Sequence, residues 1–200
     1  LKVNTAISLN KLNVKIFEFG LGTQDEVLEL WIPKKNWGGA FIRSKDNFYS
    51  DDILAKKDGF NNLDKKNYII ENVKVCNGSH KLSELFKYLS NNNLINGVIK
   101  IDVEGMEKSI LKSISEALPK NINIDIIFEN WDDNLDFISI KNYFRNRKLV
   151  IKELKNIIPY KKTWPKVFKG IVMILSGNYT SLEEIDFNKS TVGDIIINIE

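Results

Sequence analysis

The sequence predicts an α/β protein with a mostly parallel sheet and an antiparallel pair of strands at one edge. Two observations support this fold class. Apolar runs of strand length alternate with segments of helical periodicity, and the run over residues 98–103 is rich in β-branched residues. A nearly uninterrupted apolar strand is typical of a parallel sheet that is covered on both faces. We therefore expect a doubly wound arrangement with helices on both sides of the sheet.

The chain is organised around residues 98–111, where this strand turns directly into a helix. From Gly105 onward the apolar residues recur at helical spacing. Asp102, Glu104 and Glu107 lie at the end of the strand, where open α/β sheets bind their ligands. Glu107 has an alternative explanation, because the helix dipole favours acids in the first turn. Asp102 lies within the apolar strand and would need a partner there.

The segments before this strand are expected to begin with a helix over residues 1–12. A strand over residues 13–19, a turn over residues 20–22 and a second strand over residues 27–32 follow. Further on, residues 68–75 are expected to form another strand. A short helix over residues 82–89, with Ser83 as its cap, should come next. The remaining expected elements are a strand over 122–128, a helix over 137–147, and strands over 149–154, 168–175 and 194–199. The last two strands would form the antiparallel pair, and the basic, aromatic stretch over 160–166 a solvated connection.

Residues 33–64 form a long polar segment without a clear period. Long loops in compact domains are usually functional or mobile, so we expect a lid over the substrate. The residues expected closest to the substrate are Asn36, Trp37 and Gly38. Two alternatives remain open: a packed insertion with its own core, and an aromatic platform for a sugar or nucleic acid.

The composition suits a single globular domain over residues 1–200. Hydrophobic residues make up 43% and charged residues 28%, which excludes disordered and collagen-like classes. The net charge of +3 is mild and the lysines are scattered among acids, which disfavours nucleic acid as a partner. No apolar run approaches the roughly 18 residues of a membrane span, and no signal peptide is visible. We expect a cytoplasmic protein without a membrane span, for which an oligomer is possible.

The chain contains one cysteine, Cys76, and one histidine, His80. A single cysteine excludes an internal disulfide, fits a reducing compartment, and is expected to be a small buried residue. A zinc site needs several cysteine or histidine ligands, so none is expected. A Ser-His-Asp triad that uses His80 remains open, although no G-x-S-x-G motif accompanies it.

The run IKIDVEGMEKSIL over residues 99–111 resembles the K-I-D-V-E-G-x-E-x-x-v-L signature of the FkbM-type methyltransferases, which use S-adenosylmethionine. Shorter stretches resemble other parts of that family's pattern in the same order. They are residues 1–10, 13–22, 36–39, 82–85 and 126–129. The resemblance covers roughly residues 1–130 and implies the Rossmann-like sheet of class I methyltransferases. It also implies S-adenosylmethionine as cofactor and a small-molecule or glycan acceptor that is methylated on oxygen.

The resemblance implies roles for particular residues. Gly20 and Leu21 would lie on the adenine side of the cofactor, and Asp102 would also lie at the cofactor. Methyl transfer needs an acceptor placed in line behind the methyl group, and a hydroxyl acceptor needs a base. Without a well-placed histidine the base must be a carboxylate. The candidate catalytic residues are Asp102, Glu104 and Glu129.

Asp102 and Glu129 should face one another across the ends of adjacent parallel strands, with Glu104 at the rim. Two acids so close are stable if one is protonated, if a cation lies between them, or if backbone donors satisfy both. The cation alternative would resemble the magnesium-dependent methyltransferases. In those enzymes an Asp follows one strand and an acid-Asn pair follows the next, and Asp102 and Glu129-Asn130 imitate this pattern. The FkbM-type resemblance requires no metal, and hard cations also need water and substrate oxygens, so no metal is expected.

Two parts of the family's cofactor site are missing from this sequence: a Gly-rich loop after the first strand and an acid after the second. Only about a dozen residues precede residues 13–19, whereas a strand-helix-strand unit takes roughly 30. We therefore expect a truncated methyltransferase domain that lacks the family's first strands, binds S-adenosylmethionine poorly and is inactive as it stands. The alternative is a non-catalytic binding or assembly module. A nucleotide-sugar or other Rossmann-type enzyme is a weaker alternative, because no G-x-G-x-x-G motif or P-loop occurs.

Overall fold

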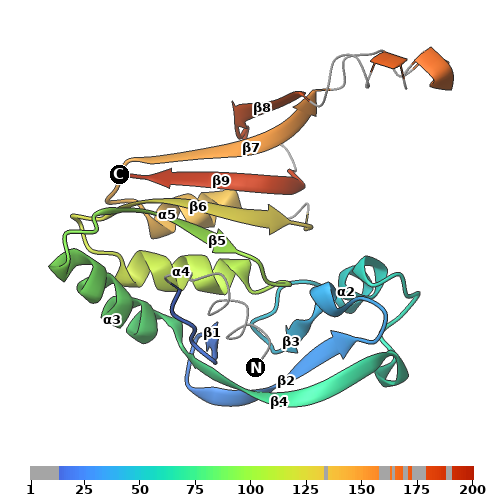
Figure 1. The fold of residues 1–200 in the computed structure, drawn as a ribbon, viewed down its shortest axis with the longest axis horizontal. Helices are drawn as coiled ribbons and strands as arrows, with labels where there is room; N and C mark the ends of the chain where they lie inside the picture. Colours follow the sequence, from blue (N-terminus) through green and yellow to red (C-terminus); the bar gives the residue numbers. More distant parts are fainter. Residues whose placement is uncertain are drawn as a thin grey trace.

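The protein folds into two β-sheets with helices beside them (Figure 1). The computed structural model describes residues 14–132, 135–157, 163, 165–168, 171–172, 179–187 and 191–200. The helix expected over 1–12, most of the strand expected over 168–175 and most of the loop over 160–166 lie outside these residues. No helix in the described part of the chain has both the length and the apolar character needed to cross a bilayer.

The first sheet is mixed and has the strand order β1-β4-β2-β3. Its strands are β1 (Gly20–Gly22), β2 (Glu26–Pro33), β3 (Phe41–Arg43) and β4 (Tyr68–Asn77). β2 runs antiparallel to β3 and β4, whereas β1 runs parallel to the end of β4. The predicted strand over residues 13–19 is not found, because residues 14–18 are exposed and unpaired. The predicted turn over residues 20–22 is instead β1.

The segment over residues 33–64 contains η1 (Trp37–Gly39), β3 and α2 (Asp51–Lys57), and η2 (Lys65–Asn67) follows it. α2 begins at a Ser50 cap, whose Oγ accepts a 3.3 Å hydrogen bond from the Ile53 N–H. A separate hydrophobic core holds this segment against β2 and β4. Its buried members are Trp31, Phe41, Tyr49, Leu54 and Tyr68. Of the alternatives for this segment, the structure therefore shows the packed insertion with its own core.

The second sheet has the strand order β5-β6-β9-β7-β8. Its strands are β5 (Asn96–Ile101), β6 (Asn123–Asn130), β7 (Leu149–Ile157), β8 (Tyr179–Glu184) and β9 (Gly193–Ile199). β5 and β6 are parallel, whereas β6 with β9, β9 with β7 and β7 with β8 are antiparallel. The strands expected over 27–32, 68–75, 98–103, 122–128, 149–154 and 194–199 are β2, β4, β5, β6, β7 and β9, with ends shifted by a few residues.

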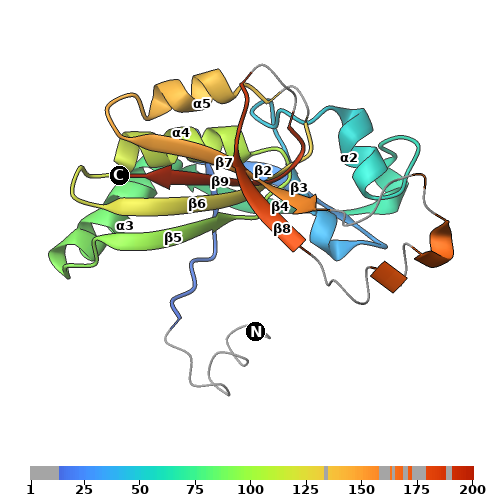
Figure 2. The same cartoon turned by 90° about the horizontal axis from the view of Figure 1, so that it is seen from above.

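Three helices contribute to the core of the second sheet: α4 and α5 lie on the same side of it (Figure 2), and α3 packs against α4. They are α3 (Gly78–Asn91), α4 (Glu107–Ala117) and α5 (Phe137–Tyr143). α3 begins earlier than predicted and is capped by Asn77, whose side-chain oxygen accepts a 3.0 Å hydrogen bond from the His80 N–H, and not by Ser83. The shared core includes Leu111, Ile114, Ile126, Phe128, Ile140, Ile195 and Ile197.

The prediction of a mostly parallel, Rossmann-like methyltransferase sheet is wrong. The described strands form two separate mixed sheets, and most of their pairings are antiparallel. The second sheet is also covered on one face only, since Val98 is 66% exposed and β6 alternates buried and exposed residues. The prediction failed because a continuous apolar run does not reveal the direction of its neighbours. Such a run also does not show that both faces of the sheet are covered. In β9, Ile195 and Ile197 are fully buried, whereas Ile196 between them faces the open side of the sheet.

Candidate functional site

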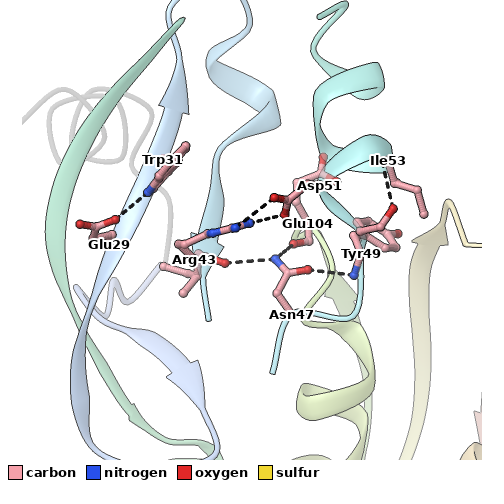
Figure 3. Close-up of polar contacts among 10 residues, drawn as sticks. Glu29, Trp31, Arg43, Asn47, Tyr49, Asp51, Ile53 and Glu104 are labelled. Carbon is pink, nitrogen blue, oxygen red and sulfur yellow. Dashed lines mark hydrogen bonds and ion pairs between the residues drawn. The ribbon is translucent and has the colours of Figure 1, made fainter. Parts of the chain in front are cut away.

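The turn that links β5 to α4 is one of the places where the two sheets meet; another is β1, whose Leu21 packs against the core of the second sheet. Asn47, in the loop after β3, donates from Nδ2 to the Ile42 carbonyl at 3.1 Å and to the Glu104 carbonyl at 2.8 Å (Figure 3). The Phe48 N–H donates to the Gly105 carbonyl at 3.0 Å. These bonds attach residues 33–64, which we call the packed segment, to the strand ends of the second sheet.

Tyr49 extends this contact to the end of β6. Its ring is 4% exposed, and its hydroxyl lies between Glu107 Oε1, to which it donates at 3.5 Å, and the Trp131 N–H, from which it accepts at 3.0 Å. Burial raises the Tyr49 pKa strongly, and the charge of Glu107 raises it further. The hydroxyl is therefore a hydrogen-bonding group and not an acid at neutral pH.

Glu107 is the most deeply buried carboxyl group of the site. It is 1% exposed, and its Oε2 has no hydrogen-bonding partner among the described residues. Burial raises its pKa to about 7, which the backbone N–H groups of Glu107 and Gly105 oppose. The charge of Glu104 raises the pKa further, and that of Lys57 lowers it. Glu107 can therefore gain or lose a proton near neutral pH.

Lys57 of α2 forms an ion pair with Glu104, and the two side chains are only 12% and 15% exposed. The ammonium lies 4.5 Å from the centre of the Trp131 ring and 5.6 Å from that of Tyr49. Burial raises the Glu104 pKa, the bond to Lys57 lowers it, and the charges of Glu129 and Asp58 raise it. We call Tyr49, Lys57, Glu104, Glu107 and Trp131 the strand-end cluster.

Asp102 follows β5, and Glu129 lies near the end of the neighbouring parallel strand β6, since Ile101 pairs with Phe128. Both side chains are exposed: Asp102 is 82% exposed and lies 3.5 Å from the ammonium of Lys100. Of the three predicted catalytic residues, only Glu104 belongs to the strand-end cluster. Glu129 reaches that cluster through its charge, which acts on Glu104.

The residues predicted at the cofactor do not form a site for S-adenosylmethionine by themselves. Gly20 lies in β1, where an added Cβ would stand 3.3 Å from Val75 Cγ2, so the glycine serves close strand packing. Leu21 packs against the core of the second sheet. The carboxylate of Asp102 points into solvent beside Lys100. These three residues thus do not fit this cofactor.

The residues predicted closest to the substrate lie on η1 and its cap. Trp37 is 74% exposed, and Gly38 follows it. Burial raises the pKa of Asp58 and Asn36 lowers it, and the charge of Asp58 in turn acts on Glu104. These three residues are therefore linked to the strand-end cluster only indirectly.

A pocket of about 450 Å³ adjoins the cluster on the side of the packed segment. Its lining is mostly polar, with an apolar part from Ile42 and Leu54. The other lining residues are Arg43, Ser44, Lys45, Asn47, Tyr49 and Asp51. Arg43 donates two hydrogen bonds to the Asp51 carboxylate, at 2.5 and 3.1 Å (Figure 3).

The geometry does not favour the magnesium alternative. Among the described residues, no group of three or more His, Cys, Asp and Glu side chains could hold a metal ion. Asn130 is 1% exposed, and its amide donates to the carbonyls of Thr191 and Asp132 at 2.6 and 2.8 Å. This asparagine therefore shapes the turn after β6 and does not face Asp102.

The sequence did not indicate the roles of Tyr49, Lys57 and Trp131, and Glu107 had an equally good explanation in the helix dipole. No local pattern marks Lys57, because its partner Glu104 lies 47 residues away. The sequence did single out Glu104 and Glu107, as acids at the end of a strand. Comparison of the chain with protein-family models, curated proteins and solved structures found no match. The function is therefore inferred from the residues of the site.

Proposed function

We propose that this chain supplies the acceptor site of an S-adenosylmethionine-dependent methyltransferase that acts on an oxygen of a small or carbohydrate-like acceptor. The observation that carries the proposal is the position of Glu104, a mostly buried carboxylate paired with Lys57 beside the partly exposed Trp131. This group follows the β5 strand, within the run that resembles the FkbM-type signature. A cytoplasmic location belongs to the same proposal and fits the single cysteine.

Each residue of the site has a distinct task in this proposal. The indole of Trp131 is 44% exposed and offers an apolar face on which a sugar ring can stack. The exposed carboxylate of Glu129 accepts hydrogen bonds from acceptor hydroxyls. Glu104 takes the proton of the reacting hydroxyl, and burial shifts its pKa toward the working pH. The ammonium of Lys57 stabilises the negative charge that develops on the acceptor oxygen.

The cofactor would supply an electrophilic methyl group. Since Gly20, Leu21 and Asp102 do not fit S-adenosylmethionine, the proposal assigns only acceptor binding and proton removal to the described residues. Acceptor binding and proton removal involve only the acceptor, Glu129 and the strand-end cluster.

The test is a methyl-transfer assay with the natural gene product, labelled S-adenosylmethionine and a panel of monosaccharides and small hydroxy acids. We expect a methyl ether in the product. Glu104→Gln should lower kcat at least 100-fold, since general-base catalysis contributes roughly 10² to 10⁴. Trp131→Ala should mainly raise the KM of the acceptor. The control is Glu116→Gln on α4, whose carboxylate is half exposed.

Two results would contradict the proposal. One is the absence of methyl transfer to every acceptor although cofactor binding is shown by calorimetry. The other is an unchanged kcat in a folded Glu104→Gln variant. Circular dichroism of each variant separates loss of the base from loss of the fold.

A non-catalytic binding module is the second candidate, and the solvent exposure of Asp102 favours it. A module of this kind would bind the acceptor without changing it. Saturation-transfer NMR with the same monosaccharides discriminates the two functions. Acceptor binding that depends on Trp131, together with no methyl transfer, would support the module.

A further inference from the structure

Glu107 is buried behind the proposed acceptor site and connects to it through Tyr49. The Tyr49 hydroxyl joins Glu107 on α4 to the backbone N–H of Trp131, which follows β6. The preceding residues Asn47 and Phe48 are bonded to the β5–α4 turn. The packed segment, α4 and the end of β6 therefore meet at one carboxyl group.

We propose that Glu107 is a positioning residue of the acceptor site, and that its proton controls how firmly Tyr49 holds the packed segment and Trp131 together. Protonated Glu107 keeps this contact closed. Ionised Glu107 loosens it, and the position of Trp131 and Lys57 changes with it. The consequence for methyl transfer rests on the proposed function, whereas the contact itself does not.

The surroundings of Glu107 explain why ionisation opposes the closed contact. An ionised carboxylate that is 1% exposed would leave Oε2 charged and without a donor from the described residues. Glu104, from the β5–α4 turn, adds a like charge and Lys57, from α2, an opposite one. Lys57 is already bonded to Glu104, so it compensates Glu107 only partly. Tyr49, from the loop before α2, gives a single long hydrogen bond of 3.5 Å.

The consequence of opening is hydration of the carboxylate. Water reaches Oε2 once Tyr49 moves away, and the desolvation cost of the charge is removed. The amides of Phe48 and Trp131 then lose their bonds to Gly105 and Tyr49. Their exchange with solvent is thus a direct reading of the state of the contact.

The experiment is residue-resolved hydrogen exchange by NMR on the 200-residue chain at pH 6 and pH 8, expressed as protection factors. In the wild type we expect the protection of the Phe48 and Trp131 amides to fall about tenfold between the two pH values. In Glu107→Gln the fall should be less than twofold, because the amide cannot ionise. In Tyr49→Phe the Trp131 amide should be unprotected at both pH values. Glu116→Gln, the same substitution at a half-exposed position of α4, should behave as the wild type.

A carboxyl-carbon titration of Glu107 in the wild type keeps the test decisive if a variant fails to fold. A midpoint near pH 7 is expected, and a midpoint below 5 would overturn the proposal. Protection that is equal at both pH values in the wild type, or a tenfold fall that persists in Glu107→Gln, would overturn it as well. None of these readings uses methyl transfer. A failure here and a failure of the proposed function are therefore distinguishable.

Discussion

The backbone of Gly105 lies directly against the side chain of Asn47. Gly105 has a φ of +84°, and an added Cβ would stand 2.8 Å from Asn47 Cγ and 3.0 Å from Tyr49 Cγ. A side chain at this position would meet both the backbone strain of the left-handed region and two fixed neighbours. The contact between the two sheets therefore requires a glycine here.

Gly105→Ala should lower the free energy of unfolding by about 2 kcal/mol or more, because the backbone strain at a positive φ and the close contacts of the added Cβ both destabilise the folded state. Urea denaturation measures this change. The matched control is Gly97→Ala on β5, where an added Cβ meets nothing within 4 Å. That variant should be as stable as the wild type, and equal losses in the two variants would contradict the role of Gly105.

The stability of the protein should depend on pH through Glu107. Its folded-state pKa of about 7 lies above the ordinary value of 4.5, so the unfolded chain loses this proton first as pH rises. The free energy of unfolding should fall by roughly 3 kcal/mol between pH 4.5 and 7 and then level off. Denaturation of Glu107→Gln over the same range should lack this fall. A slope that is the same in both proteins would exclude Glu107 as its source.

Lys57→Met should destabilise the fold by roughly 2 to 4 kcal/mol, because it leaves the mostly buried Glu104 carboxylate without its cation. It should also raise the pKa of both Glu104 and Glu107, since Lys57 lowers both. Thermal denaturation and carboxyl NMR provide the two measurements. Lys148→Met, which removes an exposed pair with Glu200, is the control and should cause no measurable loss.

The 200-residue chain should bind S-adenosylmethionine poorly or not at all. Gly20 and Leu21 serve the packing of β1, and Asp102 is in solvent, so these residues offer the cofactor no enclosed site. Isothermal titration calorimetry checks this expectation directly. A micromolar dissociation constant for the chain would show that the described residues do hold the cofactor.

Asp102→Asn tests whether the strand-end acid takes part in the reaction. A group that acts in the transition state would lower turnover far more than cofactor affinity when it is removed. Since Asp102 is exposed and lies outside the strand-end cluster, we expect turnover close to that of the wild type. Single-turnover kinetics and calorimetry separate these two effects. Near-normal turnover would leave Asp102 as an exposed acid paired with Lys100.

The sequence by itself determined most of the elements and the point at which they converge. Strands β2, β4, β5, β6, β7 and β9 were predictable because apolar and β-branched periodicity is a local property of the chain. The run over residues 98–111 also located the turn after β5. The sequence also placed Asp102 and Glu129 near the ends of two neighbouring strands, β5 and β6, which are parallel.

Tertiary structure alone decided the sheet topology and the membership of the site. β9 runs antiparallel between β6 and β7, and strand direction leaves no trace in a run such as residues 195–199. Lys57 meets Glu104, and Tyr49 meets Glu107, across separations of 47 and 58 residues. The raised pKa of Glu107 comes mainly from burial, and the distant Tyr49 contacts its carboxyl group. Burial and charge proximity are properties of the folded chain, and for that reason the site could not be derived from periodicity.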